Sequence, residues 1–140
     1  QLQSSAASDV YKRQLYQVAA ANSGIVVGTG NKVEDFGVGF YTKYGDGGVD
    51  ISPIADCNKT EVWEMGKELG ILESIINAKP TDGLWDDGRT DEDQLGLSYT
   101  EIEEAMKNSK SKYYEKYLSI RKPNLHKMLP IPVCKFEKDE

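Results

Sequence analysis

A hydroxyl and a carboxylate lie close together in a glycine-rich turn early in the chain. Thr29 follows a short apolar run, Ile25–Val27, and Glu34 comes about a turn and a half of helix later. The two side chains can therefore face the same mouth, which suits a phosphate carrying Mg²⁺, an ion that prefers oxygen ligands and one or two carboxylates. A simpler interpretation makes Thr29 a helix N-cap and Glu34 a solvent-facing residue. The spacing alone leaves both open.

A second set of charged side chains lies in the glycine-rich loop Thr42–Asp50. Lys43 can pair with a phosphate as a point charge, and Asp46 or Asp50 can accept hydrogen bonds from ribose hydroxyls or amides. The glycines permit a close approach of the backbone to a ligand. A glycine-rich hairpin with exposed charges would contain the same residues, so this loop also has two interpretations.

Two further segments carry charge without specifying a site. Lys79–Asp93 is long and rich in acids, but it lacks the alternating Asp pattern and closing Glu of an EF-hand. A loop of this length is typical either of a mobile lid or of disorder. His126 and Lys127 can bind an anion, although His126 is the lone histidine, which excludes multi-histidine metal sites.

A strand and a short helix must position the first pair. Leu15–Asn22 favours a helix, and Ile25–Val27, between two glycines, is typical of a buried parallel strand. The strand runs into the turn Gly28–Asn31 and a short helix from Lys32 towards Phe36. Such a corner, at the carboxyl end of a strand, is where open α/β sheets bind nucleotides.

Helices and polar connections make up the rest of the chain. Ser98 and Glu101 form a capping box, and Asp56 or Asn58 can cap the helix that follows them. The tail Lys122–Glu140 holds three of the five prolines and is expected to be extended. Helices are predicted over Lys59–Leu69, Leu72–Ala78, Tyr99–Asn108 and Lys112–Arg121.

The composition fits one soluble α/β domain, since 39% of the 140 residues are hydrophobic and 29% are charged. A net charge of −6 argues against a nucleic-acid-binding surface. No apolar run approaches the roughly 20 residues of a membrane span. Cys57 and Cys134 show neither zinc spacing nor a disulfide framework. We therefore expect a cytoplasmic protein with no nucleic-acid or membrane partner.

Five ordered blocks together resemble ammonia-dependent NAD⁺ synthetases of the ATP-pyrophosphatase group. The resemblance covers about Leu15–Lys127 and is specific because the blocks match in order. It implies an α/β fold with a Rossmann-like parallel sheet and flanking helices. The blocks are GTGNKVE (28–34), FYTKYGDGG (40–48), PIAD with KTEV (53–62), KPTDGLW (79–85) and TDE with LG (90–96).

The same resemblance implies a reaction and a role for each candidate residue. The family uses ATP and Mg²⁺ to adenylate the nicotinate carboxylate of deamido-NAD⁺, and ammonia then displaces AMP to give NAD⁺. Asp46 is a weaker, catalytic candidate for orienting ammonia, and Lys79–Asp93 would close over the substrates. The implied contacts are Thr29, Lys59 and Thr81 with ATP, Glu34 with Mg²⁺, and Lys43, Asp50, His126 and Lys127 with deamido-NAD⁺.

The chain departs from the family at its beginning. The family's Ser-Gly-Gly-x-Asp-Ser pyrophosphate loop is absent, and residues 1–14 stand in its place. The string Asp9–Gln14 resembles the translated end of a sequencing adapter, although a natural disordered terminus fits as well. We expect residues 1–14 to be a non-native tail and residues 15–140 to be the C-terminal part of an NAD synthase domain. The N-terminally truncated chain would then hold ATP poorly and could be inactive, while its parent would be a homodimer.

Two alternatives stay open. The chain can be the C-terminal part of a glutamine-dependent NAD⁺ synthetase, whose ammonia comes from a separate amidase domain. It can also be a non-catalytic module that binds nucleotide or Mg²⁺.

Overall fold

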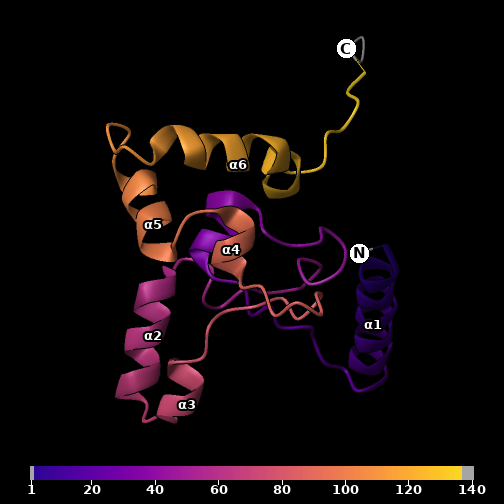
Figure 1. Cartoon of the computed structure of the whole chain (residues 1–140). Coiled ribbons are helices and arrows are strands. Elements are labelled where there is room, and N and C mark those ends of the chain that lie inside the picture. Colours follow the sequence, from indigo (N-terminus) through magenta and orange to yellow (C-terminus); the bar gives the residue numbers. More distant parts are fainter. Residues whose placement is uncertain (1, 137–140) are drawn as a thin grey trace.

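The computed structural model describes residues 2–136, and helices dominate it (Figure 1). In this view α5 and α6 lie along one side of the molecule, α2 and α3 project below them, and α1 stands apart on the other side. The elements are α1 (Leu2–Ala21), the π-helix η1 (Val33–Val38), α2 (Lys59–Glu68), α3 (Glu73–Ile76), α4 (Asp91–Leu95), α5 (Tyr99–Lys107) and α6 (Tyr114–Met128).

The expected strand at Ile25–Val27 is reduced to a single bridge. Val27 pairs in parallel with Ile51, and the Gly28 amide donates to the Ile51 carbonyl over 2.7 Å. Val26 is buried, but Ile25 and Val27 are 59% and 52% exposed. The prediction of a buried strand is therefore wrong here, because no layer within residues 2–136 covers these side chains. The pairing is parallel, as expected, yet the described residues form no sheet.

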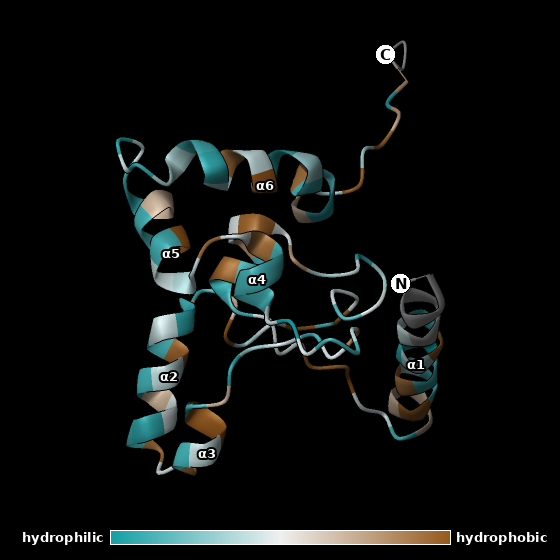
Figure 2. Cartoon of the chain, in the orientation of Figure 1, coloured by the Kyte–Doolittle hydropathy of each residue, from teal (hydrophilic) through white to brown (hydrophobic). Residues whose placement is uncertain are grey.

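The core surrounds η1. Val33 and Val38 from η1 are fully buried against Ile102 of α5 and Tyr117 of α6. Figure 2 shows apolar residues in η1, at the centre of the molecule, and others along α1, where Leu15 and Val18 are 52% and 60% exposed. The short π-helix is thus the element against which the larger helices pack.

One face of α6 holds the C-terminal end of η1. Residues spaced three apart on a helix lie on the same face, and three polar side chains at that spacing reach carbonyls of η1 and of the turn that follows it. They are Arg121, which donates to the Phe36 carbonyl and to that of Gly37 (2.6 Å), Asn124, which donates to Val38 (3.0 Å), and Lys127, which donates to Gly39 (3.0 Å) and Tyr41 (2.7 Å).

Capping residues define three helix starts. The Asn58 amide donates to Glu61 Oε2 over 2.6 Å at the start of α2, and the Ser98 amide donates to Glu101 Oε2 over 2.9 Å at the start of α5. The Ser98 cap is the one predicted, and Asn58 is one of the two predicted candidates, the other being Asp56. A third, in which Thr90 caps α4, was not predicted, because Asp91–Asp93 had been assigned to the polar loop.

Two helices extend beyond their predicted bounds. α1 includes Leu15–Ala21 but runs back without a break to Leu2, so it crosses the expected boundary between residues 14 and 15. That boundary itself stays a prediction. The extended tail predicted from Lys122 is wrong as far as Met128, because α6 continues through Pro123. Pro123 has no N–H to donate to the Ser119 carbonyl, and the helix is held on both sides of it by the bonds of Arg121, Asn124 and Lys127 to Gly37, Val38 and Gly39. Within residues 2–136, no helix has the length and apolar content needed to cross a bilayer.

Gly39, in the turn after η1, provides a test of how tightly η1 packs against α6. Gly39 and Gly70 both end a helix with φ at +68°, but a Cβ on Gly39 would lie 2.6 Å from Asn124 Cβ, whereas one on Gly70 would meet nothing within 4 Å. We expect Gly39→Ala and Gly70→Ala each to lose about 1 kcal/mol from the left-handed backbone. Gly39→Ala should lose a further ~1–3 kcal/mol from overpacking.

Urea unfolding of the two variants measures this difference. Equal losses of stability in Gly39→Ala and Gly70→Ala would show that the contact between η1 and α6 is not tight.

Candidate functional site

An ion pair joins two of the predicted site residues. Lys59 Nζ lies 2.9 Å from Glu34 Oε1, and both side chains are 18% exposed. Glu34 belongs to η1 and Lys59 begins α2. A partly buried pair of this kind is screened less by salt than a surface pair, so the two charges hold each other in place.

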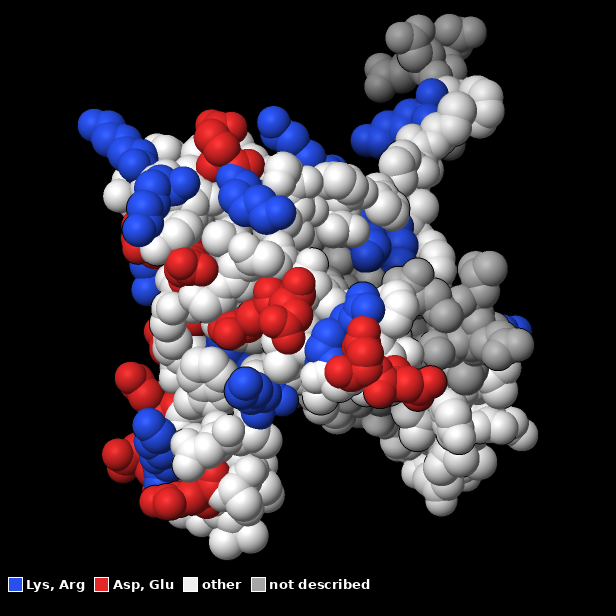
Figure 3. Space-filling view, in the orientation of Figure 1, with Lys and Arg blue, Asp and Glu red and all other residues white. Residues whose placement is uncertain are grey.

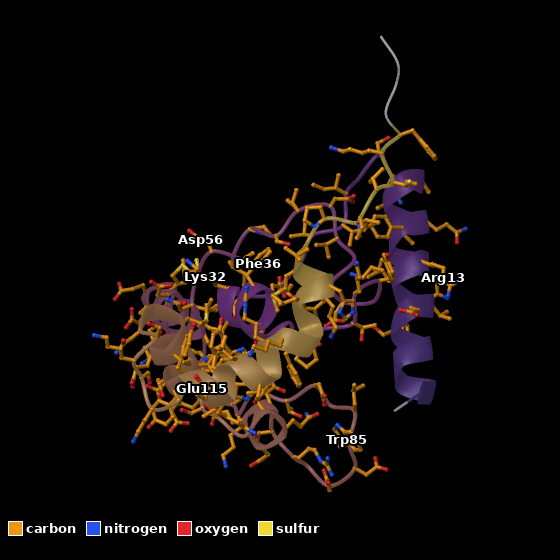
Figure 4. The ribbon with its side chains drawn as sticks, turned by 90° about the horizontal axis from the view of Figure 1, so that it is seen from above. Arg13, Lys32, Phe36, Asp56, Trp85 and Glu115 are labelled. Atoms are coloured by element: carbon orange, nitrogen blue, oxygen red, sulfur yellow. The ribbon has the colours of Figure 1, made fainter. Side chains whose placement is uncertain are left out.

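The backbone around this pair is fixed by two further contacts. The Lys32 amide donates to the Cys57 carbonyl over 2.8 Å, and the Lys32 ammonium pairs with Asp56 over 2.8 Å. Figure 4 shows Lys32 and Asp56 together at the edge of η1, on the far side of the molecule from Arg13. These contacts join the start of η1 to the turn before α2, which brings Glu34 and Lys59 together.

The N-terminus of α2 is held by a buried acid of α5. Glu103, only 6% exposed, accepts from the Thr60 amide over 3.1 Å and from the Thr60 hydroxyl over 2.7 Å. A carboxylate at a helix N-terminus is stabilised by unpaired amides and by the helix dipole. Lys59, one residue before Thr60, therefore projects from a fixed helix start.

Glu34 is oriented through both of its oxygens. Oε2 accepts from the Asn31 amide over 3.2 Å, and Oε1 accepts from Lys59 and from the Tyr99 hydroxyl, each over 2.9 Å. Asn31, 2% exposed, caps η1 in turn, because its side-chain oxygen accepts from the Val33 amide over 3.0 Å and from the Glu34 amide over 3.1 Å. The carboxylate thus has one defined orientation.

A second cluster forms between the glycine-rich loop and the end of α6. Lys43 Nζ donates to the His126 carbonyl over 3.0 Å. Lys127, the next residue, donates to the Gly39 and Tyr41 carbonyls, and its burial lowers the pKa of its ammonium while the nearby charge of Asp46 raises it. Two lysines and the histidine predicted to share a ligand therefore lie together, although 83 residues separate Lys43 from His126.

The other predicted residues are held locally. Asp46 accepts from the Thr42 amide over 2.8 Å, Asp50 from the Val26 amide over 2.8 Å, and the Thr81 hydroxyl donates to the Arg89 carbonyl over 3.1 Å. Thr29 is exposed just beyond the parallel bridge. In the part of the chain that the structure describes, no hydrogen bond or ion pair joins Thr29, Asp50 or Thr81 to Glu34 or Lys59.

The donor set matches part of a magnesium site. Mg²⁺ commonly takes one or two protein carboxylates and completes its shell with phosphate oxygens and water, and Glu34 offers one oriented carboxylate. Across residues 2–136, no group of three or more His, Cys, Asp or Glu side chains is placed to hold a metal. Glu34 therefore fits as a single ligand that needs oxygens from outside these residues.

A pocket of about 430 Å³ opens beside this site, between α2, α3 and the two ends of the long polar loop. Pro80, next to Thr81, lies in its wall with Trp63 and Lys67, and Thr90 and Asp93 contribute the polar edge. Figure 3 shows acidic side chains gathered over α4, whose first turn holds three acids, with basic side chains nearby. The pocket has the mixed apolar and charged lining that suits a small polar ligand.

Three residues of the Glu34 environment were not predicted from the sequence as site residues: Asn31, Asp91 and Tyr99. Asn31 lies in the predicted turn just before a helix, a position where Asn commonly caps the helix, so this role could have been predicted from the local sequence. Tyr99 lies 65 residues from Glu34, and Asp91 reaches the site only through Tyr99. No local pattern marks such contacts.

A family model and curated relatives place this chain in the same protein family. The model of the family described as NAD synthase matches residues 8–133. An NH(3)-dependent NAD(+) synthetase from Methanosarcina mazei is 53% identical over 93 residues, which are 66% of this chain and 36% of that protein. One from Pyrococcus horikoshii is 42% identical over 126 residues, 90% of this chain and 46% of that protein. This chain therefore spans less than half the length of these curated relatives.

A solved structure has the same fold. The NMN synthetase from Francisella tularensis superposes with a TM-score of 0.86 at 33% identity, over 94% of this chain and 56% of that one. The arrangement of helices described above is thus the arrangement found in that larger protein.

Asp35 provides a test of the charge around the site. Burial, together with the nearby charges of Glu34 and Asp46, raises the pKa of Asp35 to about 6. Since this pKa lies above its unfolded value, the ionised side chain destabilises the fold above pH 6, and the loss is relieved as pH falls from 6 towards 4. Asp35→Asn should therefore raise Tm at pH 8, with a gain that shrinks through this window.

Thermal unfolding from pH 4 to 8 measures that gain. Glu115→Gln, which removes one charge from an exposed position on α6, is the control. A gain from Asp35→Asn that is the same at every pH would contradict the assignment.

Proposed function

Because this chain belongs to the NAD synthase family, we propose that it is part of an enzyme that amidates deamido-NAD⁺ to NAD⁺ with ATP and ammonia. The observation that supports this most directly is the oriented pair of Glu34 and Lys59, 2.9 Å apart, beside the turn after Thr29. The relatives are named for NAD⁺ synthesis with NH₃, and the activity of the whole protein is inferred from them.

The chemistry requires two polyanions to be held together. A carboxylate is a poor acyl donor until one of its oxygens becomes part of a phosphate leaving group. In the proposed reaction the nicotinate carboxylate attacks the α-phosphorus of ATP, pyrophosphate leaves, and ammonia then attacks the acyl carbon and AMP leaves. Positioning and charge compensation supply most of the catalysis in such steps.

Each charged residue has a part in this scheme. Lys59, with Thr29 and Thr81, would contact ATP and offset the charge that moves towards pyrophosphate. Glu34 would hold Mg²⁺, which when bound neutralises phosphate charge. Lys43 with His126 and Lys127 would bind the dinucleotide, together with Asp50, and Asp46 would orient ammonia. The segment Lys79–Asp93 would close over both substrates and exclude water from the adenylate.

We also infer that the parallel bridge belongs to the Rossmann-like sheet of this family. The exposed apolar side chains of Ile25, Val27 and Ile51 are what an interior strand pair shows when its flanking layers are not in the described chain. A division between a tail (1–14) and an NAD synthase domain (15–140), a homodimeric parent and a cytoplasmic location remain predictions. So does the absence of nucleic-acid and membrane partners.

A mononucleotide is the second candidate substrate. The solved structure with a TM-score of 0.86 is titled an NMN synthetase. In this second proposal the chain would belong to an enzyme that amidates a nicotinate mononucleotide, so no adenylate half of the substrate would need a binding site. Lys43, His126 and Lys127 could then serve the single phosphate of the smaller substrate.

The first test joins this chain to the part of a relative that it does not cover. A chimaera would carry the upstream part of the Pyrococcus horikoshii relative followed by residues 15–140. With ATP, Mg²⁺ and ammonia, we expect it to convert deamido-NAD⁺ to NAD⁺ with one AMP per product, measured by chromatography. Formation of ADP would contradict adenylation, faster turnover of nicotinate mononucleotide would favour the second candidate, and a requirement for glutamine would favour a glutamine-dependent parent.

The second test concerns the loop lysine. Lys43→Ala in the same chimaera should raise KM for deamido-NAD⁺ by about tenfold or more, the effect of losing one charge-assisted hydrogen bond, with little change in KM for ATP. Lys110→Ala, an exposed lysine between α5 and α6, is the matched control. Equal kinetic constants for the Lys43 and Lys110 variants would show that Lys43 is a surface charge that does not contact the substrate.

A further inference from the structure

A chain of hydrogen bonds links Glu34 to a buried acid that the proposed reaction does not use. The Tyr99 hydroxyl lies 2.9 Å from Glu34 Oε1 and 2.9 Å from Asp91 Oδ2. Tyr99 is 1% exposed and Asp91 7% exposed. Asp91 begins α4 and Tyr99 begins α5, so the three residues come from three elements.

The number of protons fixes the direction of these bonds. A phenol has one hydrogen to donate, so Tyr99 can donate to only one of the two carboxylates. Glu34 already accepts from Lys59 and from the Asn31 amide, which makes it an acceptor through both oxygens. The second 2.9 Å contact then needs a hydrogen on Asp91.

The surroundings of Asp91 favour that hydrogen. Within the described residues, Asp91 Oδ1 is buried and has no hydrogen-bond partner, which is costly for a charged carboxylate. Burial raises the pKa of Asp91, and the charges of Glu34 and Asp82 add to this, while the hydrogen bond to Tyr99 and the charge of Lys59 oppose it. With that hydrogen on Asp91, Asp91 donates to Tyr99 and Tyr99 donates to Glu34.

We propose that Asp91 is a positioning residue that, through the Tyr99 hydroxyl, holds the Glu34 carboxylate in the orientation that the nucleotide site uses. The assignment of a ligand role to Glu34 rests on the proposed function, whereas the positioning itself does not. Lys59 restrains the same oxygen from α2 and packs 4.9 Å from the centre of the Tyr99 ring, so α2, α4 and α5 all converge on one carboxylate.

The test compares three variants of the 140-residue chain. Asp91→Asn keeps a donor for the Tyr99 oxygen, whereas Asp91→Ala and Tyr99→Phe break the link. The readout is the amide signal of Asn31, which donates to Glu34 Oε2, followed by ¹H–¹⁵N NMR and hydrogen exchange. We expect a shifted signal and at least threefold faster exchange in Asp91→Ala and Tyr99→Phe, and wild-type behaviour in Asp91→Asn. Glu104→Ala, an exposed acid on α5, is the control.

Two results would overturn the proposal. An Asn31 signal that is unchanged in Asp91→Ala and Tyr99→Phe would show that Glu34 does not depend on them. Equal damage from Asp91→Asn and Asp91→Ala would show that Asp91 acts as an ionised acceptor. If Asp91→Ala fails to fold, Tyr99→Phe against Asp91→Asn carries the same comparison.

A kinetic measurement separates this inference from the proposed function. In the chimaera, Asp91→Ala and Tyr99→Phe should raise the KM for Mg²⁺ about tenfold, as loss of a residue behind a metal ligand commonly does, and Asp91→Asn should not. A chimaera that makes no amide product would count against the proposed function alone, since the Asn31 signal in the 140-residue chain would still report the positioning.

Discussion

The fold depends on satisfying the backbone of one short π-helix. η1 is six residues long, and Val33, Gly37 and Val38 within it are buried, with α5 and α6 packed against it. Unpaired buried backbone groups are costly. Asn31 supplies the acceptors at one end, and Arg121, Asn124 and Lys127 supply the donors at the other. Single-turn π-helices are frequent at functional sites, and here η1 contains Glu34.

The contacts around η1 also determine which charged side chains lie close together. Glu34 of η1 accepts from Lys59, and Glu103 accepts from the Thr60 amide at the helix start from which Lys59 projects. Two opposite charges in a partly buried position need hydrogen bonds as well as each other, and Tyr99 and Asn31 provide them. η1 also brings Asp35 close to Glu34 and Asp46, which explains why burial and like charges act together on Asp35.

The sequence predicted the parts of this arrangement that have local causes. The helices at α2 and α5 follow from their caps, Asn58 and Ser98, and the turn into η1 follows from its glycines. The continuation of α6 past Pro123 was not predictable, because it is stabilised by side chains that reach carbonyls more than 80 residues away. The prediction of a buried strand at Ile25–Val27 was wrong for the opposite reason. Its apolar pattern is typical of a strand covered by flanking layers, and the described residues do not provide those layers. The same holds for the site. Glu34 and Lys59 could be predicted as site residues from the sequence, but the contacts that Tyr99 makes with both of them could not.

Lys127 shows how one residue can serve both the fold and a ligand. An ammonium has three hydrogens to donate, and within the described residues two of those of Lys127 go to the Gly39 and Tyr41 carbonyls. One donor is left, and Lys43, which uses one on the His126 carbonyl, has two. Binding an anion between them would therefore not require either lysine to release the backbone. A positive charge held against carbonyls also binds an anion without first losing side-chain entropy. Lys127 therefore contributes both to holding the turn after η1 and to the cluster that would recognise a phosphate.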